Sequence, residues 1–149
     1  MLRARSGAIA LYCLALMTAP VLAQGAEYSG MWACQSAYDE FDQSGNRTGG
    51  FVREYMIALY PNQTFEAQGT RGDMNGYHPF QSQGNWYLEA DRLMVQGPEL
   101  SATSQIVPTS FVMIGQILQN GAMAFTYEQP DSAQRYIMSR SNYLCERSQ

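Results

Sequence analysis

The sequence has no lysine, one histidine and three cysteines, and these scarcities limit what the protein does. All nine basic residues are arginine, against 13 acidic residues. An acidic chain without a basic run is a poor partner for nucleic acid or for an anionic membrane surface, so neither partner is expected. Imidazole and thiolate, the donors that transition metals prefer, are nearly absent. The sequence therefore predicts no metal and no cofactor.

Catalytic motifs are also missing. His78 lies in Tyr77-His78-Pro79, a loop-to-strand setting more typical of a rim or turn residue than of a catalyst. No Gly-x-Ser-x-Gly accompanies it, so a serine triad has no support. Residues 39–42 offer carboxylates, but Phe41 stands where a calcium ligand should be. We therefore predict a non-enzymatic protein without catalytic residues.

The N-terminus carries an uncharged apolar run behind two arginines. Arg3 and Arg5 precede residues 6–17, which are mostly apolar, and small residues end at Ala23. This pattern predicts a secretory signal peptide over 1–23, because the run is shorter than the ~20 residues that span a membrane. Its removal from the 149 residues leaves 126, with seven arginines against 13 acidic residues and a formal net charge of −6. The prediction is one domain over 24–149, exported to the periplasm or secreted, without a membrane span.

Two cysteines remain in that mature domain. Cys34 lies near its start and Cys145 near its end. In an oxidising compartment a disulfide between them is the expected state. Closing a loop of this length stabilises a fold by up to ~4–5 kcal/mol in the chain-entropy model. A pair of free thiols or a redox pair is the alternative, but no C-x-x-C motif supports it.

The mature sequence is a succession of short apolar segments separated by turn residues. Alternating apolar residues and intervening Gly, Pro, Asn and Asp predict strands. Eight are expected, over 28–38, 51–60, 64–69, 80–88, 92–96, 104–119, 122–128 and 134–147. Residues 71–78 have loop composition, Gly97-Pro98 is expected to end the fifth strand, and Asn120-Gly121 signals a hairpin. A helix over 111–118 is the main rival, but its Val, Ile and Phe content favours a strand.

Eight strands with short connections predict an all-β, antiparallel fold. An up-and-down barrel makes the first and last strands neighbours, which brings Cys34 and Cys145 together. A β-sandwich is the alternative, because it too could place the cysteines side by side. Eight strands leave an interior that side chains fill or that holds one small ligand.

Several motifs resemble those of small lipocalin-like, calycin-type barrels. Gly30-x-Trp32 is similar to the G-x-W signature of their first strand, and Gly84-Asn85-Trp86 followed by Asp91-Arg92-Leu93 is similar to a later hairpin. The resemblance implies a lipocalin-like barrel whose first tryptophan packs at the closed end under an arginine of the last strand. Arg140 and Arg147 are both candidates for that arginine.

Aromatic residues and methionines are abundant, which fits either core filling or a ligand site. The first functional hypothesis is a barrel that binds a small apolar or amphiphilic molecule. Its cavity would be lined by Trp32, Leu59, Phe65, Trp86, Leu93 and Phe125, and its mouth by Tyr55, Tyr87, Tyr127 and Tyr136 with Met56, Met94 and Met113. The second is a protein-binding module, such as an inhibitor of a secreted enzyme. A structural envelope protein is a third possibility.

Overall fold

The computed structural model describes residues 25–101 and 110–148, and the predicted signal peptide over 1–23 lies outside them. Eight strands occupy the described part of the chain. They are β1 (Gly30–Phe41), β2 (Arg47–Leu59), β3 (Thr64–Asp73), β4 (Gly76–Glu89), β5 (Arg92–Ser101), β6 (Ser110–Ile117), β7 (Met123–Pro130) and β8 (Ile137–Arg147). Within this part no helix is long and apolar enough to cross a membrane.

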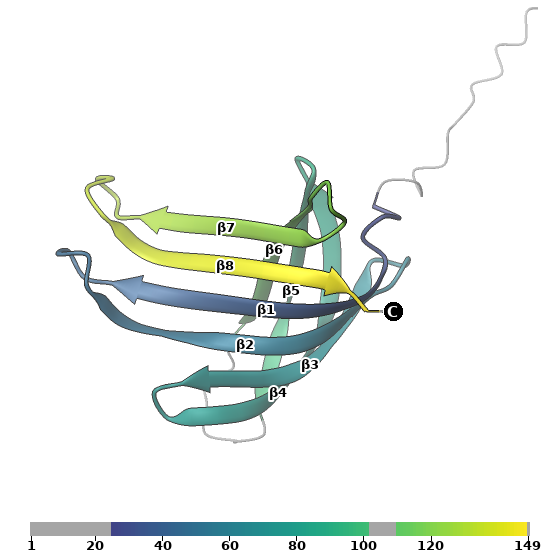
Figure 1. The fold of residues 1–149 in the computed structure, drawn as a ribbon, viewed down its shortest axis with the longest axis horizontal. Helices are drawn as coiled ribbons and strands as arrows, with labels where there is room; N and C mark the ends of the chain where they lie inside the picture. Colours follow the sequence, from purple (N-terminus) through teal and green to yellow (C-terminus); the bar gives the residue numbers. More distant parts are fainter. Residues whose placement is uncertain (1–24, 102–109, 149) are drawn as a thin grey trace, which may run out of the picture.

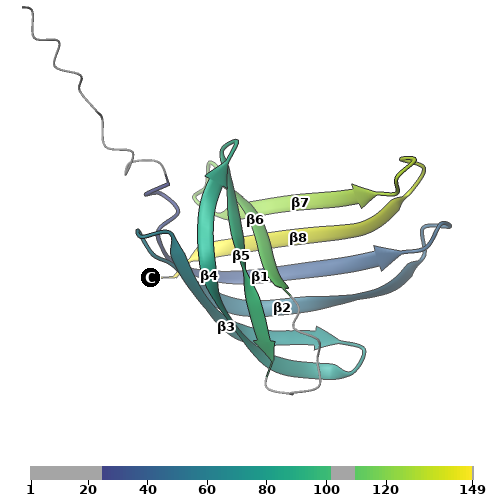
Figure 2. The same ribbon diagram turned by 180° about the vertical axis from the view of Figure 1, so that it is seen from behind.

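Every strand pairs with its sequence neighbours, and β8 pairs with β1, so the sheet closes into an antiparallel barrel. This confirms the all-β barrel and excludes the sandwich. Figure 1 and Figure 2 show β7, β8, β1 and β2 running side by side, with β5 crossing them steeply. The ring is uneven, because β6 and β7 pair only at Gln116↔Ala124 and Ile117↔Met123.

The disulfide lies where the ring closes. Cys34 of β1 and Cys145 of β8 are directly opposite each other and are bonded. Their side chains are buried at 3% and 1% exposure, so the bond is part of the core. The predicted pairing is therefore confirmed, and the bond joins the first and last strands.

Several predicted strand ends were wrong, mostly because the strands are longer than their apolar patterns. The predicted loop at 71–78 instead forms the ends of β3 and β4 around a two-residue turn, with Asp73 paired to Gly76. Gly97-Pro98 does not end β5, which continues to Ser101. Pro98 is exposed and is paired with Ser110 at the end of the β5–β6 ladder, a position where a strand tolerates proline. The predicted strand over 104–119 is seen as β6, and 102–109 lie outside the described residues.

The core fills one end of the barrel, which we call the closed end and which holds the start of β1 and the end of β8. Trp32 is fully buried there and its Nε1 donates to the Tyr28 carbonyl at 2.8 Å. The Arg147 guanidinium lies 4.5 Å from the Trp32 ring centroid. Arg147, not Arg140, is therefore the arginine over this tryptophan, because Arg140 pairs with Glu128 on the outer surface.

Candidate functional site

Most of the predicted cavity residues pack into the core of the closed end. Trp32, Leu59, Phe65, Trp86 and Leu93 are 0–3% exposed, and all five belong to one cluster of buried residues. A side chain with almost no accessible surface borders no space large enough for water, because neighbouring atoms contact it on every side. These five residues therefore line no cavity, and the surface available to a ligand lies farther along the barrel.

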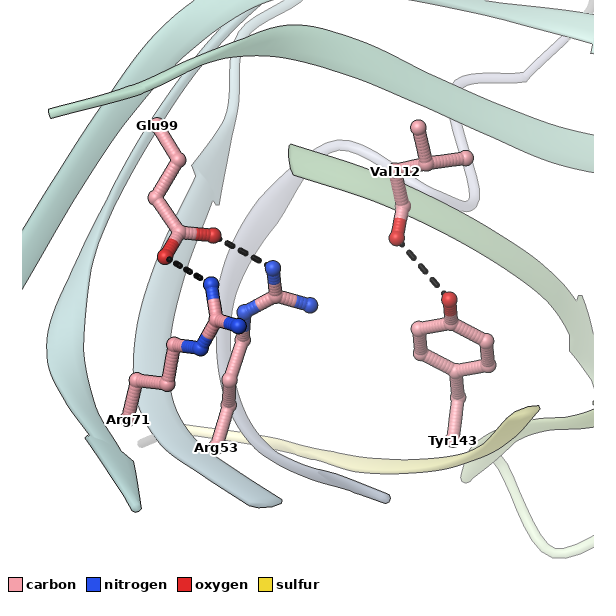
Figure 3. Close-up of polar contacts among 5 residues, drawn as sticks. All are labelled: Arg53, Arg71, Glu99, Val112 and Tyr143. Atoms are coloured by element: carbon pink, nitrogen blue, oxygen red, sulfur yellow. Dashed lines mark hydrogen bonds and ion pairs between the residues drawn. The ribbon is translucent and has the colours of Figure 1, made fainter. Parts of the chain in front are cut away.

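A charged cluster lies between this core and the opposite end, which we call the open end. Arg53 of β2 and Arg71 of β3 are directly paired positions, and both reach Glu99 of β5 (Figure 3). Arg71 Nη1 lies 3.2 Å from Glu99 Oε1, and Arg53 Nη2 contacts Glu99 Oε2. The Arg53 and Glu99 side chains are 5% and 1% exposed, whereas Arg71 retains 19%. Two like charges on facing positions repel each other, so the shared carboxylate is what holds them together.

Aromatic rings surround the buried arginine. The Arg53 guanidinium lies 4.3 Å from the Phe51 centroid and 5.2 Å from the Phe111 centroid. Arg71 lies 4.0 Å from the same Phe51 ring, so both guanidinium groups contact it. Such contacts are attractive, and they strengthen where water is excluded. The cluster is therefore held in place by both its ion pairs and its ring contacts.

Two tyrosines complete this polar layer. The Tyr143 hydroxyl of β8 donates to the Val112 carbonyl of β6 at 2.9 Å (Figure 3), a contact between strands that do not pair. Burial raises the pKa of Tyr143, although the Ser141 side chain and the Arg53 charge oppose that shift. Burial also raises the pKa of Tyr55, whose hydroxyl lies 3.2 Å from Met113 Sδ. Both phenols are therefore neutral at physiological pH and bear hydrogen-bonding groups rather than charges.

At the polar layer and beyond it, inward-facing aromatic side chains remain partly exposed. Tyr38 of β1 stacks on Phe51 of β2 with centroids 5.1 Å apart, and both are half-buried. On β7, Phe125 and Tyr127 follow Met123 at alternate positions and so face the same side, toward the barrel interior. Phe125 is half-buried, with the Arg92 guanidinium of β5 5.8 Å from its ring centroid, and Tyr127 is 45% exposed. The inner surface of the open end thus offers apolar rings and phenol hydroxyls to a bound molecule.

The predicted mouth residues separate into three groups. Tyr55 and Met113 lie in the core, at 5% and 0% exposure. Tyr87, Met56 and Met94 face outward, because each alternates with a buried inward neighbour, so their assignment to the mouth was wrong. Tyr127 faces inward at the open end, and Tyr136 lies half-buried just before β8.

Sequence reasoning overlooked the three charged residues of the cluster. Arg53 alternates with Phe51, Tyr55 and Ile57 on the inward face of β2, and an arginine at an apolar-face position is a signal that could have found it. Glu99 gave no such signal, because it lies beyond the point where the fifth strand was expected to end. His78 lies opposite Arg71 on β4, half-buried, and so borders the same cluster.

The outer face of the sheet carries a shallow groove of about 350 Å³. Its lining residues come from β1 to β5 and include Met31, Met56, Glu66, Gln68, Gln81 and Leu100. Met31 and Leu100 are 46% and 56% exposed. This groove is a second surface of mixed apolar and polar character, separated from the inner surface by the thickness of the sheet.

Comparisons of the chain with protein-family models, with curated proteins and with solved structures gave no significant match.

Proposed function

We propose that this chain is an exported, non-enzymatic barrel that binds a small amphiphilic molecule on the inner surface of its open end. The observation that carries the proposal is the set of inward-facing rings that keep part of their surface exposed, Tyr38, Phe51, Phe125 and Tyr127. Apolar side chains turned into a barrel are normally covered by other side chains, because covering them stabilises the fold. A ligand tail would complete that burial.

The chemistry of this surface favours an amphiphile over a purely apolar molecule. Concave sites of mostly apolar lining with a few placed polar groups orient ligands that have both characters. Here the rings lie next to the Arg53–Glu99–Arg71 cluster and to the Tyr143 hydroxyl. A tail would lie on the rings and a head group would reach the polar layer.

Export to the periplasm or the extracellular space is part of the same proposal. The predicted signal peptide over 1–23 supports it, and so does the disulfide between Cys34 and Cys145, because such bonds persist in oxidising compartments.

The test uses two tyrosines of equal exposure on opposite faces of the sheet. Tyr127 is 45% exposed on the inner side, and Tyr87 is 44% exposed on the outer side. Titration with N-phenylnaphthylamine, a neutral probe that fluoresces in apolar sites, should give saturable binding to the purified protein. Tyr127→Ala should weaken binding about tenfold, the effect of losing roughly 1.5 kcal/mol of ring burial, whereas Tyr87→Ala should leave it unchanged.

The second candidate is a protein-binding module. The specific observation behind it is the outer groove with exposed Met31 and Leu100. Apolar side chains at the centre of a groove rimmed by polar groups are typical of protein interfaces. Absence of probe binding, or binding that is lost in Tyr87→Ala and kept in Tyr127→Ala, would contradict the inner site.

A further inference from the structure

In the described part of the chain, one edge of β7 lacks a neighbouring strand over most of its length. β7 pairs with β8 from Met123 to Pro130, but its pairing with β6 ends at Ala124. Figure 1 and Figure 2 both show β6 turning steeply away from β7 beyond the hairpin that joins them. We call the side of β7 that faces away from β8, from Phe125 to Pro130, the free edge.

The main-chain groups at this edge follow from the hydrogen bonds of the hairpin. In antiparallel strands, facing residues alternate between pairs that exchange main-chain hydrogen bonds and pairs that do not. Leu118 N–H donates to the Ala122 carbonyl at 2.7 Å. Counted by twos along β7, the residues that turn toward β6 are therefore Ala124, Thr126 and Glu128. The N–H and C=O groups of Thr126 and Glu128 thus point out of the free edge.

A contact on the facing side of β6 supports this count. Counting by twos from Leu118 along β6 reaches Val112, which should also turn its main-chain groups toward β7. Its carbonyl accepts a hydrogen bond from the Tyr143 hydroxyl of β8 at 2.9 Å (Figure 3), so it points away from β5. A side chain thus supplies the donor that a neighbouring strand would otherwise have supplied.

The sequence of β7 does little to prevent pairing at the free edge. Edge strands are commonly protected by lysine, by charged side chains or by proline. The chain has no lysine, and the one charged residue of β7, Glu128, pairs with Arg140 at 2.7 Å. Pro130 has no N–H, so it ends the free edge rather than blocking its middle. Phe125 and Tyr127 are of residue types that favour strands.

We propose that the free edge binds an extended segment of another polypeptide, which adds to the sheet as a strand antiparallel to β7. Phe125 and Tyr127 face the barrel interior and keep exposed surface, whereas Thr126 and Glu128 face outward. Facing residues of neighbouring strands lie on the same side of the sheet and contact each other. The segment therefore has apolar side chains on its inner side and polar ones on its outer side. This site is the edge of the barrel wall, and it does not rest on the function proposed above.

Charge favours another polypeptide over a second copy of this chain. The chain has 13 acidic residues against nine arginines, a formal net charge of −4. Two copies repel each other, whereas a segment flanked by basic residues is attracted. The partner class is thus an extended segment with apolar residues at alternate positions and basic residues beside them.

The experiment uses a fluorescent peptide of alternating threonine and valine with an arginine at each end. Fluorescence anisotropy should show saturable binding of this peptide to the purified protein. The same peptide with glutamate at each end should bind at least about threefold more weakly at low ionic strength, because the protein is acidic.

N-methylation of the peptide tests the main-chain bonds without changing the protein. When the valines face inward, the residues opposite Thr126 and Glu128 are threonines, and these exchange main-chain hydrogen bonds with them. Methylation of the threonine nitrogens should therefore weaken binding by about tenfold or more. Methylation of the valine nitrogens is the control, and it should leave binding within about twofold, because those N–H groups point away from β7.

Proline substitution tests the same bonds from the side of the protein. Thr126→Pro removes an N–H of the free edge and leaves the bonds to β8, since that N–H points away from β8. It should weaken binding of the arginine-flanked peptide by about tenfold or more. Thr126→Ala should leave binding unchanged, because it also loses the Asn142 contact but keeps the N–H. Melting curves show whether each variant folds, and Glu128→Pro replaces Thr126→Pro if the latter does not.

Four results would overturn the proposal. The first is no binding of the arginine-flanked peptide, and the second is equal binding to the proline and alanine variants. The third is equal binding of the threonine-methylated and unmodified peptides. The fourth is a dimer of the protein alone in sedimentation that Thr126→Pro dissociates and Thr126→Ala does not, since a second copy then occupies the free edge.

Discussion

Tyr55 and Tyr143 place two phenol groups near the same buried arginine. Burial raises the pKa of both, and for both the Arg53 charge opposes that shift. The cost of removing a phenolate from water therefore exceeds the attraction of the nearby cation. This balance means that the polar layer contains neutral hydroxyls and one charged cluster, and not several separate charges.

The first prediction follows from the Tyr143 phenol. A raised folded-state pKa gives stability that is complete below the unfolded value of about 10 and is lost as pH rises through the folded-state pKa. The free energy of unfolding should therefore fall as pH rises above about 10, by at most ~1.4 kcal/mol per pH unit for each such phenol. Urea unfolding at a series of pH values measures this, and Tyr143→Phe should show a smaller fall.

Tyr77→Phe provides the control for this series, because its side chain is 77% exposed in the fold. It should keep the same loss of stability as the unsubstituted protein. If Tyr143→Phe also keeps that loss in full, the phenol is not desolvated and the description of the polar layer is wrong.

Single residues were predictable from sequence where a repeated pattern constrained them. Trp32 and Cys34 are two positions apart on the first strand and so share a face, and both are buried. Phe51, Arg53, Tyr55, Ile57 and Leu59 alternate along the second strand, and all five point inward. Arg147 could not be separated from Arg140, because both occur on one strand and only the position of the strand end decides which one reaches Trp32.

At the scale of elements, β4 and β5 approach each other closely at two glycines. Gly84 and Gly97 lie opposite each other in a register set by Ser82↔Glu99 on one side and Asn85↔Gln96 on the other. A Cβ atom at Gly84 would lie 2.3 Å from the Gln96 carbonyl oxygen and 2.9 Å from the Phe65 ring. The absence of both side chains is what lets the Phe65 ring pack here.

The second prediction tests this approach. Gly84→Ala should lower the free energy of unfolding by about 1–3 kcal/mol, the usual cost of forcing an extra carbon into a packed core. The clash is with backbone, so rotation of a side chain cannot relieve it. Chemical denaturation measures the difference, and Gln81→Ala, on the exposed face of the same strand, should change stability little. Equal stability of Gly84→Ala and the unsubstituted protein would contradict the packing.

Element number was easier to predict than element length. Turn residues separated eight apolar segments, and eight strands are present in the described residues. Their outer ends were missed because glycine, aspartate and asparagine there resemble a loop, while pairing between neighbouring strands continues past the apolar positions. The open end is built from these extensions, which is why the Arg71 and Glu99 positions were not expected in a site.

For the whole molecule, closure of the barrel depends on two strand pairings of unequal length, β1 with β8 and β6 with β7, which we call seams. β1 pairs with β8 over nine residue pairs, from Trp32↔Arg147 to Glu40↔Ser139, and the disulfide lies within them. β6 pairs with β7 over two. The cysteine positions allowed the first seam to be predicted from sequence. The shortness of the second could not be, because it depends on how strongly the strands diverge and not on any residue type.

The last prediction concerns the strong seam. Because β6 and β7 pair over only two residues, closure of the ring depends mainly on the pairing of β1 with β8. Loss of the disulfide that links these two strands should therefore lower the free energy of unfolding. The double variant Cys34→Ala, Cys145→Ala should unfold at a lower temperature, with a free energy of unfolding smaller by about 2–4 kcal/mol, as expected for a disulfide that closes a long loop. Thermal and urea unfolding measure both quantities, and Gln35→Ala with Leu144→Ala, the next pair on the outer face of the same strands, is the control. Identical melting of the disulfide-free and oxidised proteins would mean that backbone pairing alone closes the barrel, and that the cysteines contribute nothing to its stability.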